Sequence, residues 1–536
     1  MAPPIAAARP VTDVYFGTSI VDPYRWMESG SAELDAWMKA QSEYTERSLG
    51  ALSLRAQLQE RVRSLANGGV EAMSAQRRGS SLYYLKQNPS EETYKLYVSE
   101  LDGTKERLIV DPTQRNSGSD TYSIDYFEPS PDGSYIAYGL SANGSEMAVI
   151  HVVETRTGRE LPETIDRARY AFPSWQPDGR SFFYKRDRLL AADAPESERF
   201  VKAPVYLHKL ETAPEQDVAV FGYGLSPQID VPASGFSYVA APEGASYLLA
   251  QVSDGVKHEI ALYAVPREQL AGPNTPWRKI FGDDAGVTDA YAFRDTLYLV
   301  SHNDAPRRKV LRLALTKRGP NDLSRAELLL PESEAVVRYL TVGKDGVYVQ
   351  LLDAGLSRIQ RIEHGTNKAG EVALPVAGTV RDVSATDGLP GITFQLSSWT
   401  LAPRLYRFDP ATNKVLDTGV IPASPVDFSR VTAREVKVSA PDGMSVPLSI
   451  LARSDLAADK PHPTLLHAYG AYGNVAEPSF DPQRLAWLER GGVFAVCHPR
   501  GGGEFGEAWH DAGKLSTKQN TINDVLACAD YLVKSA

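Results

Sequence analysis

The middle of the chain is a series of short hydrophobic runs rich in aromatic and β-branched residues, which are typical of β-strands. Each run is followed by a second apolar segment such as "KLYVSEL" or "MAVIHVV", and several runs come directly after an Asp-Gly turn, as in "SPDGSYIAY". Asp-Gly suits the positive φ angles of tight turns. The runs are "LYYL" from Leu82, "YIAY" from Tyr135, "FFYK" from Phe182, "YLLA" from Tyr247, "LYLV" from Leu297, "VYVQ" from Val347 and "ITFQ" from Ile392.

These strand pairs recur at intervals of about 50 residues, which is the repeat length of a β-propeller blade. Seven units predict a seven-bladed β-propeller over residues 71–425. A string of separate β-sandwiches is the alternative, but it would show less regular strand spacing and recognisable linkers between the domains.

The two flanks of the repeat have a different periodicity. Residues 31–66 carry hydrophobic side chains at helical spacing and predict helices. After residue 430 the pattern predicts a hairpin in "AREVKVSAPDGMSVPLSIL", then strands in "HPTLLHAYG" and "GVFAVCHPRGGG". In "SFDPQRLAWLERGG" Asp481 can cap a helix, Pro482 fits its first position and Gly491 can end it.

The last sixteen residues, "TINDVLACADYLVKSA", predict a further amphipathic helix. Its apolar face contains Ile522, Val525, Leu526, Ala529, Leu532 and Val533. Strands that alternate with helices predict a mostly parallel sheet, in which ligands bind outside the carboxyl ends of the strands. The segment "LLHAYGAYG" leaves one such strand end with Tyr469 and Tyr472 among small residues. It is either a simple tight turn or a place where backbone and phenol approach a substrate.

The composition is that of an ordinary globular protein: 536 residues, 43% hydrophobic and 23% charged. A formal net charge of −10 argues against a nucleic-acid binder. No apolar stretch is long enough for a membrane span. Because the start lacks a signal-peptide pattern, we expect a cytoplasmic protein, or a periplasmic one if a signal was removed.

Cys497 and Cys528 are too few for a disulfide framework, and since both lie in apolar runs we expect buried free thiols.

Several catalytic motifs are missing from the sequence. There is no G-x-S-x-G, no H-E-x-x-H, no paired C-x-x-C and no P-loop. The nine histidines are scattered, which argues against a metal site. "RGGGEFG" (500–506) has the G-x-G-x-x-G spacing, but no helix is predicted to open inside it, so we do not expect a dinucleotide site. His510 and Asp511 resemble a catalytic base with an orienting carboxylate. Because neighbours in sequence seldom point at one another, a structural role is favoured for both.

Four blocks together resemble the prolyl oligopeptidase family of serine peptidases. They are "DPYRWMES", "SPDGSYIAYGLSANGSE", "RARYAFPSWQPDGRSFFY" and the final "HAYGAYG…HPRGGGEFGEAWHDAGKLSTKQNTINDV". The resemblance implies a seven-bladed propeller (71–425) over an α/β-hydrolase domain, of which residues 1–70 and 426–536 are parts, with the helices of residues 1–70 packing on the hydrolase part. It implies internal cleavage of short peptides without a cofactor or metal.

The resemblance also implies where the catalytic serine belongs. In the family it follows the strand after the helix at 521–536, about 10–20 residues beyond Ala536. The aspartate and histidine come later still. We therefore expect residues 1–536 to lack the catalytic triad and to be inactive alone.

Three tyrosines receive roles from the resemblance. Tyr469 aligns with the phenol that helps to form the oxyanion hole, where a neutral donor stabilises the developing alkoxide. Tyr472 aligns with an aromatic residue of the substrate cleft. Tyr170 aligns with a propeller residue that reaches the substrate, with a place in the core of the third blade as the alternative.

The substrate preference implied by the resemblance is cleavage after proline. "HAYGAYG" is also similar to the "YGSYG" of oligopeptidase B, which cleaves after basic residues, so this specificity stays open, as do a dipeptide-releasing exopeptidase and a non-catalytic propeller scaffold. A propeller ring would admit only unstructured short peptides, with opening about the chain crossings near residues 70 and 425 as the gate. We expect a monomer that binds neither nucleic acid nor membranes.

Overall fold

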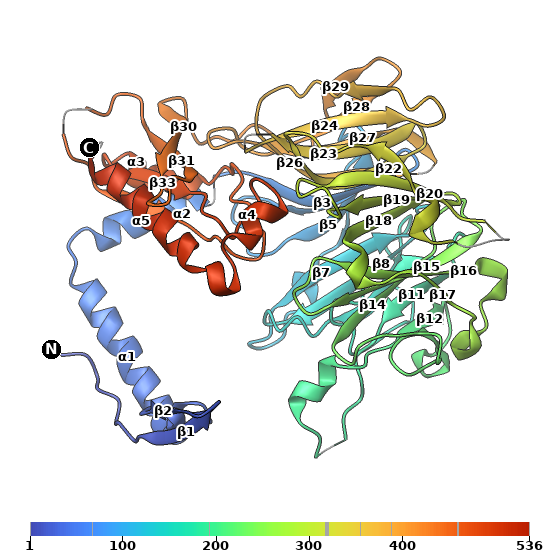
Figure 1. Cartoon of the computed structure of the whole chain (residues 1–536), viewed down its shortest axis with the longest axis horizontal. Helices are drawn as coiled ribbons and strands as arrows, with labels where there is room; N and C mark the ends of the chain where they lie inside the picture. Colours follow the sequence, from blue (N-terminus) through green and yellow to red (C-terminus); the bar gives the residue numbers. More distant parts are fainter. Residues whose placement is uncertain are drawn as a thin grey trace. The chain divides into compact units, whose positions relative to one another are not determined.

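The computed structural model describes residues 2–66, 68–191, 193–316, 321–353, 355–386, 388–457 and 460–534. The chain divides into two compact units, Met1–Asn67 and Gly68–Ala536. The second unit contains a ring of seven sheets and a separate C-terminal sheet (Figure 1).

The first unit consists of a hairpin and two helices. The hairpin pairs β1 (Val11–Tyr15) with β2 (Thr18–Asp22). It is followed by α1 (Ala32–Gly50) and α2 (Arg55–Ala66), which confirms the helices expected over 31–66. The Ser31 side chain caps α1 by accepting a hydrogen bond from the Leu34 N–H. The hairpin was not anticipated from the sequence.

The first three blades cover residues 71–221. Blade 1 contains β3 (Glu71–Arg78), β4 (Ser81–Gln87), β5 (Lys95–Glu100) and β6 (Arg107–Val110). Blade 2 contains β7 (Tyr122–Pro129), β8 (Tyr135–Ala142) and β9 (Val149–Glu154), with isolated bridges from Val153 to Glu160 and from Ile150 to Ile165 at its edge. Blade 3 contains β10 (Ser174–Trp175), β11 (Ser181–Lys185), β12 (Val205–Lys209) and β13 (Val218–Phe221).

Blades 4 to 7 each have four strands. Blade 4 contains β14 (Gly235–Ala240), β15 (Tyr247–Asp254), β16 (Ile260–Pro266) and β17 (Arg278–Phe281). Blade 5 contains β18 (Val287–Phe293), β19 (Thr296–Ser301), β20 (Lys309–Ala314) and β21 (Glu327–Leu330). Blade 6 contains β22 (Val336–Gly343), β23 (Gly346–Asp353), β24 (Leu356–Glu363) and β25 (Ala369–Glu371). Blade 7 contains β26 (Thr379–Thr386), β27 (Leu389–Ser397), β28 (Arg404–Asp409) and β29 (Lys414–Asp417).

The seven hydrophobic runs of the sequence are the second strands of these blades, and the expected seven-bladed propeller is confirmed. The side chains of these strands are buried on both faces because each blade lies between two others. One core cluster, for example, combines Phe183 and Val220 of blade 3 with Val239 and Leu248 of blade 4. Burial on both faces explains why the runs show no alternation of polar and apolar residues.

The ring closes where blade 7 meets blade 1 (Figure 1). First strands of successive blades contact one another, β18 with β22, β22 with β26 and β26 with β3, so they surround the centre of the ring. The Ser74 N–H donates to Asp382 at 2.9 Å, and the Arg77 guanidinium donates to the Pro390 carbonyl at 2.9 Å. Hydrogen bonds between blades therefore close the ring.

The C-terminal sheet has the strand order β30-β31-β33-β32. Its strands are β30 (Val431–Ser439), β31 (Ser445–Arg453), β32 (Thr464–His467) and β33 (Val493–Cys497). β32 pairs parallel with β33, whereas β31 pairs antiparallel with both β30 and β33. The expectation of a mostly parallel sheet is therefore wrong for the described strands. A tight turn forces β30 and β31 to run antiparallel, and only β32 and β33 are joined by a helical crossover.

Helical segments follow the strands of this sheet. They are η9 (Pro482–Arg484), α3 (Leu485–Leu488), α4 (Glu507–Asp511), η10 (Leu515–Thr517) and α5 (Gln519–Lys534). The Asp481 side chain caps η9 through the Gln483 N–H, Pro482 opens η9, and Gly491 follows the short helix with a left-handed φ of 78°, as the sequence predicts.

The packed face of α5 differs from the predicted apolar face. Thr521, Asp524 and Cys528 are buried, whereas Ile522, Leu526 and Val533 are exposed. The buried side chains have partners in β33 and in the loops that follow it, and hydrophobicity alone did not identify them. Among the described residues, no helix combines the length and the apolarity required to cross a bilayer.

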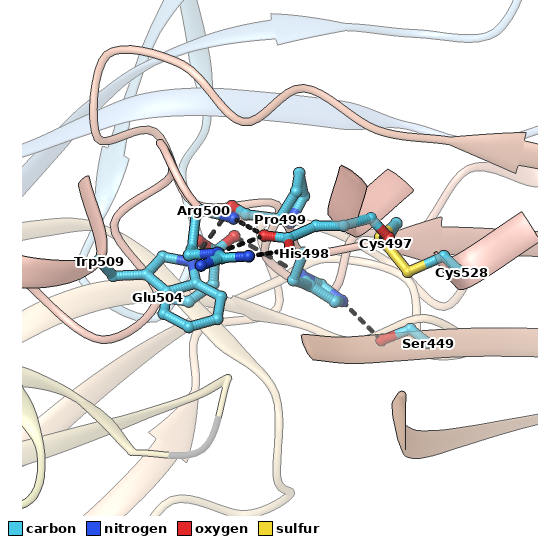
Figure 2. Close-up of a disulfide and its surroundings, with 9 residues drawn as sticks. Ser449, Cys497, His498, Pro499, Arg500, Glu504, Trp509 and Cys528 are labelled. Atoms are coloured by element: carbon cyan, nitrogen blue, oxygen red, sulfur yellow. Dashed lines mark hydrogen bonds and ion pairs between the residues drawn. A yellow bond between two sulfur atoms is a disulfide. The ribbon is translucent and has the colours of Figure 1, made fainter. Parts of the chain in front are cut away.

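The expectation of free thiols is also wrong, because Cys497 and Cys528 form a disulfide. Packing of α5 on β33 brings their Cα atoms to 6.2 Å, within the range that a disulfide spans (Figure 2). The bond ties the last described helix to the sheet.

Replacing both cysteines by alanine should lower the free energy of unfolding of the C-terminal region by about 2–4 kcal/mol, because the unfolded chain loses a cross-link. Thermal scans with and without dithiothreitol measure the effect. Reductant should lower the midpoint of the unmodified protein and leave that of the double variant unchanged. The unmodified protein can also be unfolded and refolded with reductant, so that the buried disulfide is accessible. If its thermal midpoint were unchanged after this treatment, the disulfide would not be stabilising.

Candidate functional site

Two parallel strands end at the same edge of the C-terminal sheet and position the candidate site. β32 leads into Tyr469 and β33 leads into the loop 498–506, with His467 paired to Val496 in the parallel register. Since carboxyl ends of parallel strands meet at one edge, the tyrosine turn and the glycine loop lie together.

Glycines allow three backbone segments to touch at this edge. A Cβ on Gly501 would lie 2.3 Å from the Gly470 carbonyl oxygen and 2.8 Å from that of Gly513. Gly501 also has a φ of 97°, a left-handed value. On Gly470, with φ 63°, a Cβ would meet the Thr521 side chain at 2.5 Å. Only glycine fits where the turn, the loop and the start of α5 converge.

Hydrogen bonds fix these segments to one another. The Gly473 N–H donates to the Gly501 carbonyl at 3.0 Å, and the Lys518 ammonium donates to the Gly470 carbonyl at 2.5 Å. The His510 Nδ1 lies 2.9 Å from the Gly501 carbonyl oxygen. The main chain around Tyr469 is therefore held from several sides.

Arg500 anchors the glycine loop in the interior of the sheet (Figure 2). Its backbone N–H, Nε and Nη2 all donate to the buried Asp524 carboxylate, at 2.9, 2.9 and 2.6 Å. Its Nη1 donates to Asp442 at 2.6 Å. The hydrogen bonds to Asp524 raise the pKa of the Arg500 guanidinium, which stays charged. Both groups of this ion pair are buried, and the full set of hydrogen bonds offsets the cost of removing them from water.

A Ser–His–Glu chain lies beside this anchor but is closed to substrate. The Ser449 hydroxyl is 2.9 Å from His498 Nε2, and His498 Nδ1 is 3.6 Å from Glu504 (Figure 2). The three residues are 4%, 5% and 7% exposed. Glu504 accepts a hydrogen bond from the Ala476 N–H at 3.2 Å. The chain therefore holds the glycine loop against the segment at Ala476, and sequence reading missed it because Ser449 lies far from His498 along the chain.

Tyr469 and Tyr472 both have exposed side chains, at 53% and 54%. The Tyr472 carbonyl lies 3.0 Å from Nε2 of His258, in the loop between β15 and β16 of blade 4. The His258 ring stacks on His510 at 5.7 Å between ring centres. Tyr472 also lines a cavity of about 540 Å³ together with Val256, His258, His510 and Leu515. The turn thus presents one phenol to solvent and the other to a pocket shared with the propeller.

Tyr170 lies in a separate part of the propeller. It precedes β10 and is 40% exposed, so it is not part of the blade core that was the alternative for it. Its hydroxyl donates to Glu146 at 2.5 Å, an interaction that raises the pKa of the phenol, and its ring stacks on Phe172. No described contact joins Tyr170 to Tyr469 or Tyr472.

The segment directly after the glycine motif differs from what the sequence predicts. Helix α4 does begin directly after Gly506, where no helix was expected. The helix has five residues, and its Glu507 N–H donates to the Pro306 carbonyl of blade 5 at 2.7 Å.

His510 and Asp511 do not form a pair, because His510 bonds the Gly501 carbonyl and Asp511 pairs with Lys514. Across the described ranges, no three His, Cys, Asp or Glu side chains gather as metal ligands.

Two family models match this chain. The model described as "Prolyl oligopeptidase, N-terminal beta-propeller domain" matches residues 3–417, and that of the "Prolyl oligopeptidase family" matches residues 478–536. The chain belongs to the prolyl oligopeptidase family. Members of this family are serine peptidases, and the two parts of the fold are therefore its propeller and its hydrolase region.

Relatives with assigned names are similar over nearly the whole chain. A prolyl endopeptidase of Elizabethkingia meningoseptica is 26% identical over 98% of this chain and 72% of its own length. Dipeptidyl aminopeptidase BI of Pseudoxanthomonas mexicana is 25% identical over 99% of this chain and 74% of its own.

Solved structures have the same fold. One, from work on two prolyl endopeptidases and their inter-domain dynamics, has a TM-score of 0.89 and 26% identity, and covers 100% of this chain and 76% of that chain. Prolyl oligopeptidase B of Galerina marginata, bound to a 25mer macrocyclization substrate, has a TM-score of 0.88 and 21% identity, and covers 99% and 76%.

Gly501→Ala tests the close approach of backbone segments. Gly443→Ala is the matched control, because Gly443 has a φ of 84° and an added Cβ would meet nothing within 4 Å. The left-handed backbone should cost each variant about 1–2 kcal/mol. Gly501→Ala should lose about 1–3 kcal/mol more through overpacking. Scanning calorimetry compares the two, and equal losses of stability would show that the backbone contact is unimportant.

Proposed function

We propose that this chain carries the substrate-binding and oxyanion-stabilising part of an oligopeptidase that cleaves short peptides, with proline before the scissile bond. The observation that carries the proposal is the exposed phenol of Tyr469 on a glycine-fixed turn at a strand end. A neutral O–H there can donate to the oxyanion of a tetrahedral intermediate. The nucleophilic serine, with its aspartate and histidine, is proposed to lie outside residues 1–536.

The charges near Tyr472 and Tyr170 support a neutral residue before the scissile bond. A site for arginine or lysine would require an available carboxylate. Near Tyr472, Glu259 pairs with His302 at 2.8 Å, and near Tyr170, Glu146 pairs with Arg169 at 2.7 Å. Glu146 therefore already has a cationic partner, and Glu259 already has a hydrogen-bonded imidazole. Cleavage after basic residues is the second candidate, supported by the "HAYGAYG" sequence.

The propeller is proposed to select substrates by size. The turn and the glycine loop contact blade 4 through His258 and blade 5 through Pro306. Folded proteins would be excluded while these contacts persist, and short peptides would enter when the domains open about the crossings near residues 70 and 425.

Tyr469→Phe in the full-length enzyme removes the proposed oxyanion donor and leaves the ring in place. We expect kcat to fall by about 10- to 1,000-fold, since removal of one oxyanion donor costs about 100- to 1,000-fold, with little change in the thermal midpoint. The kcat of both enzymes is measured with matched fluorogenic Gly-Pro and Gly-Arg peptides. The same rates distinguish cleavage after proline from cleavage after arginine. Residues 1–536 alone should hydrolyse neither peptide. An unchanged kcat in the variant would exclude the role of Tyr469.

A cross-link tests the gate. Pro306→Cys and Glu507→Cys, joined by a short bismaleimide in the full-length enzyme, should reduce cleavage of an octapeptide more than tenfold because the domains cannot separate. The single-cysteine variants, treated in the same way, are the controls, and the native disulfide does not react with maleimide. Full turnover in a completely cross-linked sample would refute domain opening as the entry route.

A further inference from the structure

A second cavity lies between the propeller and the segment that follows Tyr472. Its volume is about 410 Å³. It is lined by the first strands of blades 5, 6 and 7, by Tyr348, Gln350 and Ile359 on the next two strands of blade 6, and by the hydrolase residue Glu477. The cavity therefore extends from the first strands, which surround the centre of the ring, into blade 6, and Glu477 places the hydrolase segment at its wall. Its charged lining side chains are Arg338 on β22, Arg381 and Asp382 on β26, and Glu477.

The two guanidinium groups of this cavity have few partners among the described residues. Arg338 Nε is buried without a hydrogen-bond partner there, and the Arg338 guanidinium lies over the Tyr339 ring at 5.4 Å. Arg381 approaches Glu477 at 3.8 Å, an ion pair longer than a hydrogen bond. Glu477 is thus the acid that faces both arginines from the hydrolase side.

The remaining acids near the cavity each have a hydrogen-bond donor or a cation besides the two arginines. Asp382 accepts a hydrogen bond from the Ser74 N–H at 2.9 Å. Asp289 accepts from the Thr288 hydroxyl at 2.9 Å and also faces Arg308 and Arg338, and burial raises its pKa. Burial likewise raises the pKa of Glu477, whose side chain is 12% exposed. The cavity therefore contains more hydrogen-bond donors on arginine than acceptors placed to receive them.

This surplus of donors fits a carboxylate. A guanidinium presents its N–H groups in a planar fork that binds both oxygens of a carboxylate, and such charge-assisted hydrogen bonds are strong. We propose that Arg338 and Arg381 form a subsite for a carboxylate of the peptide substrate, either an acidic side chain or the C-terminal carboxylate. This inference rests on the proposed peptidase function.

The position of the subsite suits a short peptide. Glu477 follows Tyr469 by eight residues, so the two lie within about 30 Å of each other, the limit for an extended chain. An extended peptide of about eight or nine residues spans that distance. A carboxylate held at the propeller end would orient a short peptide whose scissile bond lies beside Tyr469.

The test uses the full-length enzyme and octapeptides with a single proline, in three forms. The first has a free C-terminal carboxylate, the second a C-terminal amide, and the third the amide with one glutamine replaced by glutamate. We expect a KM about tenfold lower for a carboxylate-bearing form than for the neutral amide, with similar kcat. The peptide form with the lower KM shows whether the subsite binds a C-terminal carboxylate or an acidic side chain.

Variants assign the effect to the two arginines. Arg338→Gln and Arg381→Gln should each raise KM for the carboxylate peptide about tenfold and leave the neutral amide unchanged. Arg358→Gln is the matched control, because Arg358 lies on β24 of blade 6 and pairs with Asp353 and Glu371 away from the cavity. Glu477→Gln removes the competing carboxylate and should lower KM for the carboxylate peptide.

The Glu477 variant also separates the subsite from a purely structural ion pair. If Arg381 and Glu477 only held the domains together, both variants would change KM in the same direction and for every peptide, which would overturn the subsite. Equal KM values for all three peptides in the unmodified enzyme would overturn it as well, while the peptidase function would stand. If no peptide were cleaved, the peptidase function would fail and the subsite with it.

Discussion

The candidate site depends on the contact of three main-chain segments at the carboxyl end of β33. Gly470, Gly501 and Gly513 lie so close that a Cβ on Gly501 would overlap carbonyl oxygens of both neighbours. Backbone atoms cannot move aside as a flexible side chain can, so this contact sets the path of the turn that carries Tyr469 and Tyr472. The buried Arg500–Asp524 pair then holds the glycine loop against α5, and the disulfide holds α5 against β33. An exposed phenol is useful for catalysis only when its main chain is fixed in this way.

The propeller and the candidate site are stabilised by different kinds of interaction. Each blade is stabilised by apolar side chains on both faces of its central strands, which is a generic form of packing that tolerates many sequences. The site is stabilised by glycine contacts and by a few buried polar groups with specific partners, such as His498 between Ser449 and Glu504. Sequence similarity in the glycine block is therefore more informative than similarity in the blades.

The same difference explains what the sequence could predict. The apolar runs at Leu82, Tyr135 and their successors are local signals, and they predicted seven blades correctly. The first strand of a blade, such as "VVRYLTVG" in β22, mixes polar and apolar residues because it faces the centre of the ring, and it was not recognised. The disulfide, the Ser449–His498–Glu504 chain and the contact of His258 with Tyr472 depend on residues distant in sequence. No spacing rule predicts such contacts, and the exposed side of α5 was misjudged for the same reason.

The contacts between the site and the blades also bear on how a peptide could enter. The described polar contacts include His258 with the Tyr472 carbonyl, the Glu507 N–H with Pro306, and Arg381 with Glu477. Hydrogen bonds of this kind contribute about 0.5–1.5 kcal/mol each, and a partly exposed ion pair about 0–1 kcal/mol. Breaking them costs far less than unfolding either part, because the glycine contacts and the disulfide lie inside the hydrolase region and remain intact. In the proposed gating, the turn that carries Tyr469 would therefore keep its geometry while the propeller moves away from it.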